Sequence, residues 1–121
     1  MAKILIIDDD IDTTNLLESI IKTKGHQTFS VNNSMSAVEA ANSTNPDLML
    51  MDIMMPGING IQLCKMFQSI PELKHIPIII VSALNDIGSK KDAFKAGAKD
   101  FITKPLQPAE LHQKITTWIE Q

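Results

Sequence analysis

Short apolar runs alternate along this chain with longer stretches in which apolar residues recur every three or four positions. The first pattern is typical of buried strands and the second of amphipathic helices. Most of the runs are apolar almost throughout, whereas residues 27–31 alternate polar with apolar side chains, as an edge strand does. On this basis we predict strands at residues 3–7, 27–31, 48–51, 78–81 and 101–103.

A helical pattern follows each predicted strand. Asp12 is a candidate N-cap for the first helix, and Ser36 with Glu39 forms a candidate capping box near the start of the second. The third helix is expected around residues 61–67 and the fourth at 87–96, before Gly97. Pro108 suits the first turn of the last helix, where its missing N–H is not needed.

Five strands alternating with five helices predict a parallel sheet with helices on both faces, because strand-to-strand crossovers are right-handed. The alternating second strand and the short fifth strand suit the edges. The predicted fold is therefore an α/β, doubly wound, flavodoxin-like sheet in the order 2-1-3-4-5. No linker, repeat or low-complexity segment divides the chain, so residues 1–121 are expected to form a single domain.

The amino-acid composition limits the classes of function that this chain can have. With 11 Lys and Arg against 14 Asp and Glu, the net charge of −3 gives no general attraction to nucleic acid or to anionic membranes. No apolar stretch approaches the ~18 residues of a membrane span. The single cysteine, Cys64, excludes an internal disulfide and suits a reducing compartment. We therefore expect a cytoplasmic protein that binds neither nucleic acid nor a membrane directly.

Chemically active side chains follow the predicted strands at the edge where such sheets bind ligands. Asp8 and Asp9 follow the first strand, and Asp52, Ser82 and Lys104 follow the third, fourth and fifth. Crowded carboxylates repel one another, and a divalent cation relieves this. Oxygen-only ligands with room for water favour Mg²⁺, which is commonly shared with phosphate oxygens. The pattern predicts phosphoryl chemistry, with a carboxylate nucleophile and polar partners for the phosphoryl oxygens.

Four segments resemble the motifs of response-regulator receiver domains of two-component signalling, and the likeness covers nearly the whole chain. The segments are residues 6–10 (IIDDD), 51–60 (MDIMMPGING), 81–83 (VSA) and 96–105 (AGAKDFITKP). The resemblance implies that Asp52 accepts a phosphoryl group from a sensor histidine kinase or a histidine phosphotransfer protein. It also implies that Asp52, Asp9, Asp8 largely through water, and the Met54 backbone carbonyl bind Mg²⁺.

The same resemblance implies a switch. Ser82 and Lys104 would hold the phosphoryl group, and movement of the loop after the fourth strand would let Phe101 turn inward. The surface of the fourth helix, fifth strand and fifth helix would then change and control a partner or output domain, with a phosphorylation-dependent dimer left open. The peptide bond between Lys104 and Pro105 is often cis in this family. Such a protein is a phosphoacceptor regulator, which catalyses only its own phosphorylation and dephosphorylation.

Three residues depart from common versions of the family. Phe101 has no hydroxyl, so only the packing of its ring can report the state of the switch. Met54 and Leu84 stand where side chains influence access to the phosphoryl group, and both are apolar. Because apolar side chains position water poorly, we expect a long-lived aspartyl phosphate.

Other interpretations fit less well. A haloacid-dehalogenase phosphohydrolase is the main alternative, but its Asp-x-Asp-x-Thr signature is satisfied only from Asp10, and the nucleophile belongs at the strand end, at Asp8. A flavin module would need a first loop that attracts phosphate without a metal. An EF-hand would need glycine at Thr13 and glutamate at Ser19.

The fourth helix leaves a further question open. Three lysines lie on this helix and a fourth follows it: Lys90, Lys91, Lys95 and Lys99. Together they form either a solvated face or a docking surface for an acidic partner. The sequence predicts no output domain after the last helix. It leaves open whether the chain is a stand-alone regulator or part of a longer protein, and it does not identify the kinase or the downstream partner.

Overall fold

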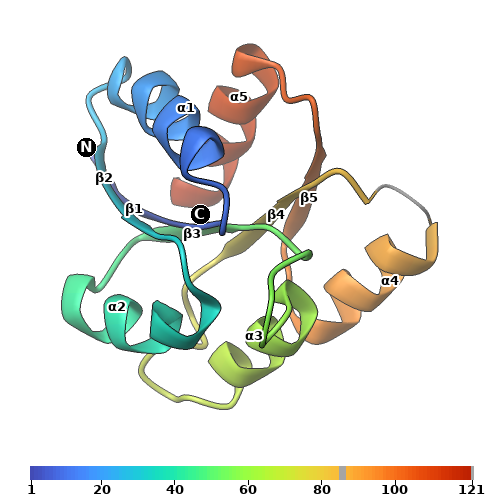
Figure 1. The fold of residues 1–121 in the computed structure, drawn as a ribbon. Helices are drawn as coiled ribbons and strands as arrows, with labels where there is room; N and C mark the ends of the chain where they lie inside the picture. Colours follow the sequence, from blue (N-terminus) through green and yellow to red (C-terminus); the bar gives the residue numbers. More distant parts are fainter. Residues whose placement is uncertain (85–86, 121) are drawn as a thin grey trace.

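A central parallel sheet lies between two layers of helices in the computed structural model, which describes residues 1–84 and 87–120 (Figure 1). The strand order is β2-β1-β3-β4-β5, as predicted. The strands are β1 (Lys3–Ile7), β2 (Gln27–Val31), β3 (Leu48–Met51), β4 (Ile78–Ser82) and β5 (Asp100–Thr103). The helices are α1 (Ile11–Lys22), α2 (Ala37–Thr44), α3 (Gly60–Gln68), α4 (Ile87–Ala96) and α5 (Pro108–Ile119), with a 3₁₀ turn, η1 (Ser34–Ser36), before α2.

The strands supply two separate hydrophobic cores. In β1, Ile4 and Ile6 pack on the face covered by α1 and α5, whereas Leu5 and Ile7 pack on the face covered by α2, α3 and α4 (Figure 1). Burial on both faces explains why the central strands are apolar throughout. None of the helices in the described residues is long and apolar enough to cross a membrane.

The start of α1 differs from the prediction by two residues. Asp10, not Asp12, is the N-cap: one oxygen of its carboxylate accepts a hydrogen bond from the Asp12 N–H at 3.1 Å, and the other accepts from the Thr13 hydroxyl at 2.8 Å. Asp12 lies in the first turn of the helix, where its negative charge still interacts favourably with the helix dipole. The β1–α1 turn is therefore tight, and α1 begins only four residues after β1.

The predicted capping box at Ser36 does not form. Ser36 makes no side-chain cap, because η1 comes first and its own N-cap, Asn33, accepts from the Met35 N–H at 2.8 Å. A capping box stands instead at α3, where the Asn59 and Gln62 side chains each accept from the other's backbone N–H. Local sequence allowed both boxes, and the turn before each helix decided which one formed.

Candidate functional site

Two buried acids and a lysine meet at the carboxyl edge of the sheet. Ile7 of β1 lies opposite Met51 of β3, so Asp8 and Asp52, which follow them, leave the sheet side by side. The Lys104 ammonium reaches back between them, with Nζ 3.0 Å from Asp8 Oδ2 and 2.9 Å from Asp52 Oδ2. The strand topology thus brings together residues that the sequence separates by up to 96 positions.

The Lys104 ammonium pairs with two carboxylates that are almost inaccessible to solvent: Asp8 is 2 % exposed and Asp52 is 8 % exposed. Burial raises the pKa of Asp8, and this effect outweighs the hydrogen bonds that its carboxylate accepts from the Asp10 N–H and Lys104. Burial alone would lower the pKa of Lys104, but its bonds to Asp52 and Asp8 prevail and raise it. With both acids ionised, two carboxylates share one ammonium, and the negative charge left over favours a further cation.

The donor set at this edge fits Mg²⁺. Asp8, Asp9 and Asp52 offer only oxygen, and Asp9 is exposed beside them. No three acidic, histidine or cysteine side chains in the described residues already converge as a ready metal site. Mg²⁺ does not need such a site, because it usually keeps several waters and few protein ligands. Two hollows of about 390 Å³ each, both lined by Asp9 and Pro56, leave room for those waters.

Ser82 and Met54 border the acids. Ser82 ends β4, is fully buried, and its Oγ accepts from the Leu84 N–H at 3.3 Å. The Met54 N–H donates to Asp52 Oδ1 at 3.3 Å, while the residue as a whole is 63 % exposed. Ser82 is also tied to the lysine through the backbone, because the Lys104 N–H donates to the Ser82 carbonyl at 2.9 Å.

Gly60 lets α3 start directly beneath the central acid. Its N–H donates to the Ile53 carbonyl at 2.8 Å, and a Cβ at this position would collide with the backbone carbonyl of Asp52. Any larger residue would push apart the loop and the helix that fix the direction of the Asp52 side chain. Steric constraints therefore favour glycine at position 60, the last residue of the MDIMMPGING segment.

The Phe101 ring is already turned inward, with only 7 % of the residue exposed, and it belongs to the core beneath α4. Lys90 of α4 lies over it, with Nζ 5.5 Å from the ring centroid, a cation–π distance. The loop after β4 includes residues 85 and 86, which are outside the described residues, so its expected movement stays a prediction. The Lys104–Pro105 peptide bond is cis.

A hydrogen-bonded network ties β5 to α5 beside this ring. The Asp100 carboxylate accepts from Lys114 Nζ at 2.7 Å and from Trp118 Nε1 at 3.0 Å. Lys114 also donates to the Phe101 carbonyl at 3.2 Å. Burial would raise the pKa of Asp100, but the Lys114 and Trp118 bonds outweigh burial and lower it, so the ion pair is maintained at neutral pH.

The β2–α2 loop also touches the site, which sequence reasoning missed. Asn32 donates to the Asp8 carbonyl at 2.9 Å, and Ser34 donates to the Pro56 carbonyl at 3.2 Å. A signal was present, because both residues follow β2 at the same edge as the acids. Being neutral, they gave no hint of metal or phosphoryl chemistry.

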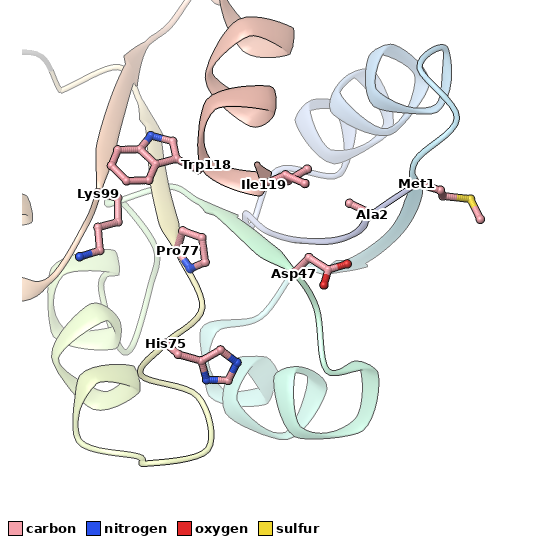
Figure 2. A pocket seen from close by; sticks show the side chains of 8 residues that line it. All are labelled: Met1, Ala2, Asp47, His75, Pro77, Lys99, Trp118 and Ile119. Carbon is pink, nitrogen blue, oxygen red and sulfur yellow. The ribbon is translucent and has the colours of Figure 1, made fainter. Parts of the chain in front are cut away.

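A larger hollow, of about 540 Å³, lies at the opposite edge, where the strands begin (Figure 2). Two of its polar residues form hydrogen bonds within the fold: Asp47 accepts from the Lys3 N–H at 2.8 Å, and Trp118 donates to Asp100. Size alone therefore does not mark the functional site, because the acids and Lys104 lie at the far ends of the strands.

Comparisons with known proteins agree on one family. The family model described as the response regulator receiver domain matches residues 4–116. Protein PilH of Pseudomonas aeruginosa is 36% identical over 115 residues, which are 95% of this chain and 95% of PilH. The crystal structure of a putative response regulator from Chloroflexus aurantiacus superposes with a TM-score of 0.94 at 31% identity, covering 99% of this chain and 98% of that one.

A second solved structure is informative about metal. The receiver domain of the sensor histidine kinase PA1611 from P. aeruginosa, described with a magnesium ion coordinated in its active site cleft, superposes with a TM-score of 0.91 at 25% identity, covering 99% of this chain and 98% of that one. Some relatives are much longer. This chain matches response regulator PleD of Caulobacter vibrioides at 31% identity over 94% of its own length but spans only 25% of PleD.

Proposed function

This chain belongs to the response regulator receiver domains, which are phosphorylation-dependent signalling switches, and we propose that Asp52 is its phosphoacceptor. The main support is the sharing of Lys104 Nζ between the buried Asp8 and Asp52 carboxylates. An Asp52 oxygen attacks the phosphorus of a phosphohistidine, the P–N bond breaks as the new P–O bond forms, and the imidazole leaves with a proton.

Asp8 and Asp9, with Asp52 and the Met54 carbonyl, would hold Mg²⁺ in this proposal. When bound, the ion supplies positive charge that offsets the phosphoryl oxygens in the transition state. Lys104 moves from bridging two carboxylates to contacting the phosphoryl group. The Ser82 hydroxyl donates to another phosphoryl oxygen, and it stands ready for this because it needs only to rotate about its Cα–Cβ bond.

The proposed phosphodonor is a sensor histidine kinase or a histidine phosphotransfer protein. Receiver domains occur within sensor kinases, as in PA1611, and in response regulators such as PleD. We propose that this chain acts as a regulator in the cytoplasm and catalyses only its own phosphorylation and dephosphorylation. Nothing in the described residues favours the phosphohydrolase alternative.

The decisive experiment is phosphorylation without a kinase. The purified chain is incubated with Mg²⁺ and a small phosphodonor such as acetyl phosphate, and its intact mass is measured. We expect a gain of one phosphoryl group that disappears when Mg²⁺ is chelated. No gain at any Mg²⁺ concentration would overturn the proposal, and repeated turnover of a phosphomonoester would restore the phosphohydrolase.

The two apolar side chains beside Asp52 predict a slow loss of the phosphoryl group. Met54 is largely exposed above the site, and Leu84 is half-buried next to Ser82. Replacing them by Met54→Asn and Leu84→Glu introduces groups that orient water. We expect hydrolysis to accelerate by about tenfold, below the usual gain from general acid–base groups. The rate of hydrolysis is measured as the loss of the added mass with time after the phosphodonor is removed.

The control is Met66→Asn, at an exposed methionine on α3, which should leave the hydrolysis rate unchanged. Equal hydrolysis rates in the double variant and the wild type would refute the proposed effect of Met54 and Leu84.

The α4–β5–α5 surface is the proposed output face. On the outside of α4, the exposed Ile87 and Phe94 stand among the lysines Lys91 and Lys95. This combination suits a partner with apolar and acidic side chains. Lys90 joins this surface to the Phe101 ring beneath it.

Phosphorylation should stabilise this face locally. A phosphoryl group held by Ser82 and Lys104 links the ends of β4 and β5 with charge-assisted hydrogen bonds. We expect amide hydrogen exchange in β5 and the first turn of α4 to slow about fivefold, the effect of roughly 1 kcal/mol. The exchange rates of α2, which packs against β1 and β2 toward the opposite edge of the sheet from β5, serve as the internal reference. Unchanged exchange in β5 and α4 at full phosphorylation would contradict the proposed switch.

A further inference from the structure

We propose that Asn32 and Ser34 are positioning residues for the divalent cation: the β2–α2 loop holds the two loops that carry the proposed ligands at a fixed separation. The inference rests on the proposed Mg²⁺ site and adds to it a pair of neutral side chains from a third loop. Neither residue needs to touch the ion. Each acts on a backbone carbonyl, and through it on the direction of a ligand-bearing segment.

Asn32 fixes the β1–α1 turn. Its amide donates to the Asp8 carbonyl at 2.9 Å and to Thr14 Oγ1 at 3.2 Å. The buried Thr14 hydroxyl in turn donates to the Ile11 carbonyl at 2.9 Å, so both ends of the turn are held. The Asp8 carbonyl belongs to the peptide unit that leads to Asp9. Holding that peptide sets the direction in which Asp9 leaves the strand.

Ser34 fixes the β3–α3 loop. It is 2 % exposed, and its hydroxyl donates to the Pro56 carbonyl at 3.2 Å. Pro56 comes two residues after Met54, whose carbonyl is a proposed ligand, and just before Gly57, which has a φ of 81°. Without the Ser34 bond, the loop between Met54 and the Gly57 turn would lose its side-chain anchor on the β2–α2 loop.

Asn33, between the two, caps its own loop and also lines the hollow beside Asp9. Its side chain accepts from the Met35 N–H at 2.8 Å and so caps η1. The hollow of about 390 Å³ beside Asp9 is lined by residues of all three loops. It gives the water shell of a cation a place between the two segments that Asn32 and Ser34 hold apart.

The expected effect follows from this indirect action. Groups that orient metal ligands typically contribute 10- to 100-fold in metal affinity. Because Asn32 and Ser34 hold backbone and not ligand atoms, we expect the low end, an increase of about tenfold in the Mg²⁺ dissociation constant for Asn32→Ala or Ser34→Ala. Asp52, Ser82 and Lys104 are untouched, so saturating Mg²⁺ should restore the wild-type rate of phosphorylation.

The test has two readouts. Mg²⁺ is titrated by isothermal calorimetry, without phosphodonor, into the wild type, Asn32→Ala, Ser34→Ala and the control Ser36→Ala, whose serine is exposed on the same loop and makes no side-chain cap bond. In parallel, the Mg²⁺ concentration that half-saturates phosphorylation by acetyl phosphate is measured. We expect tenfold shifts in both quantities for the variants at 32 and 34, unchanged values for Ser36→Ala, and equal maximal rates. Affinities equal to wild type, or an equal loss in Ser36→Ala, would overturn the inference.

The design separates this inference from the proposed function. If the wild type itself fails to bind Mg²⁺ and to gain a phosphoryl group, the proposed function fails. If the wild type does both and the variants match it, only the positioning role fails. Thermal unfolding without Mg²⁺ checks that each variant folds. Should alanine at 34 prevent folding, Ser34→Cys keeps the volume with a much weaker donor and is expected to show the same shift.

Discussion

Replacing Asp52 by asparagine should abolish the uptake of a phosphoryl group, with no gain in intact mass after incubation with Mg²⁺ and acetyl phosphate. The amide has nearly the shape of the carboxylate but is not a nucleophile toward phosphorus. It also leaves Lys104 fully available to Asp8, so the variant should fold normally. The loss expected is therefore complete and chemical in origin, not a consequence of unfolding.

Asp10→Asn is the matched control for this prediction. Asp10 lies two residues after Asp8, but its carboxylate caps α1 and accepts hydrogen bonds from the Asp12 N–H and the Thr13 hydroxyl. Asparagine is nearly as good an N-cap as aspartate, so uptake should stay within about twofold of wild type. If Asp52→Asn still gained one phosphoryl group, the nucleophile would have to be another acid at this edge, with Asp8 the first candidate.

Removing the shared ammonium should cost much of the stability of the fold. In Lys104→Met, the buried Asp8 and Asp52 face each other without a counter-charge. Breaking a buried ion pair by deleting one partner costs roughly 3–5 kcal/mol, and because Lys104 is partly exposed we expect about 2–3 kcal/mol at pH 7. Chemical denaturation with and without Mg²⁺ measures the loss, and bound Mg²⁺ should recover part of it.

The loss should depend on pH with a definite sign. Burial raises the pKa of Asp8 in the folded protein, so between its ordinary value of 3.8 and that raised value the folded state binds more protons than the unfolded state. Stability conferred by protonated Asp8 is then lost as pH rises through this window. Without Lys104 the pKa rises further. The deficit of Lys104→Met should therefore be larger at pH 7 than at pH 4.

Lys114→Met provides the comparison. Lys114 also pairs with a carboxylate, Asp100, but both side chains are about one quarter exposed. Its removal should cost about 1 kcal/mol or less. It should also show no recovery with Mg²⁺, because this pair is remote from the acidic edge. Equal losses in the two variants, or a Lys104→Met deficit that Mg²⁺ leaves unchanged, would contradict the electrostatic account of the site.

Sequence patterning predicted the sheet well because strands buried on both faces are apolar at nearly every position. Runs such as residues 48–51 are apolar at every position, and the strand order followed from the edge-like second and fifth strands. Prediction of helix starts was weaker. Asp10 and Asp12 are both good caps locally, and only the three-dimensional turn after β1 selects Asp10.

The same contrast applies to the site. Charged residues at strand ends could be placed from topology alone, and the structure brings Asp8, Asp52 and Lys104 into contact. The bracing by Asn32 and Ser34 could not be seen, because neutral side chains bonded to backbone carbonyls leave no pattern in sequence. The burial of Phe101 under Lys90 likewise depends on how α4 packs, which periodicity does not specify.

The contact between Lys104 and Asp8 also bears on how the protein folds. It joins positions 96 residues apart in a chain of 121, so it can form only after most of the polypeptide has been made. The entropy cost of closing a loop must be met before such a non-local contact stabilises the chain, so contacts of this kind tend to form late. A chain still emerging from the ribosome, or one cut before β5, lacks the ammonium that Asp8 and Asp52 share. If Asp52 and Lys104 act as proposed, a partly folded chain cannot yet receive a phosphoryl group.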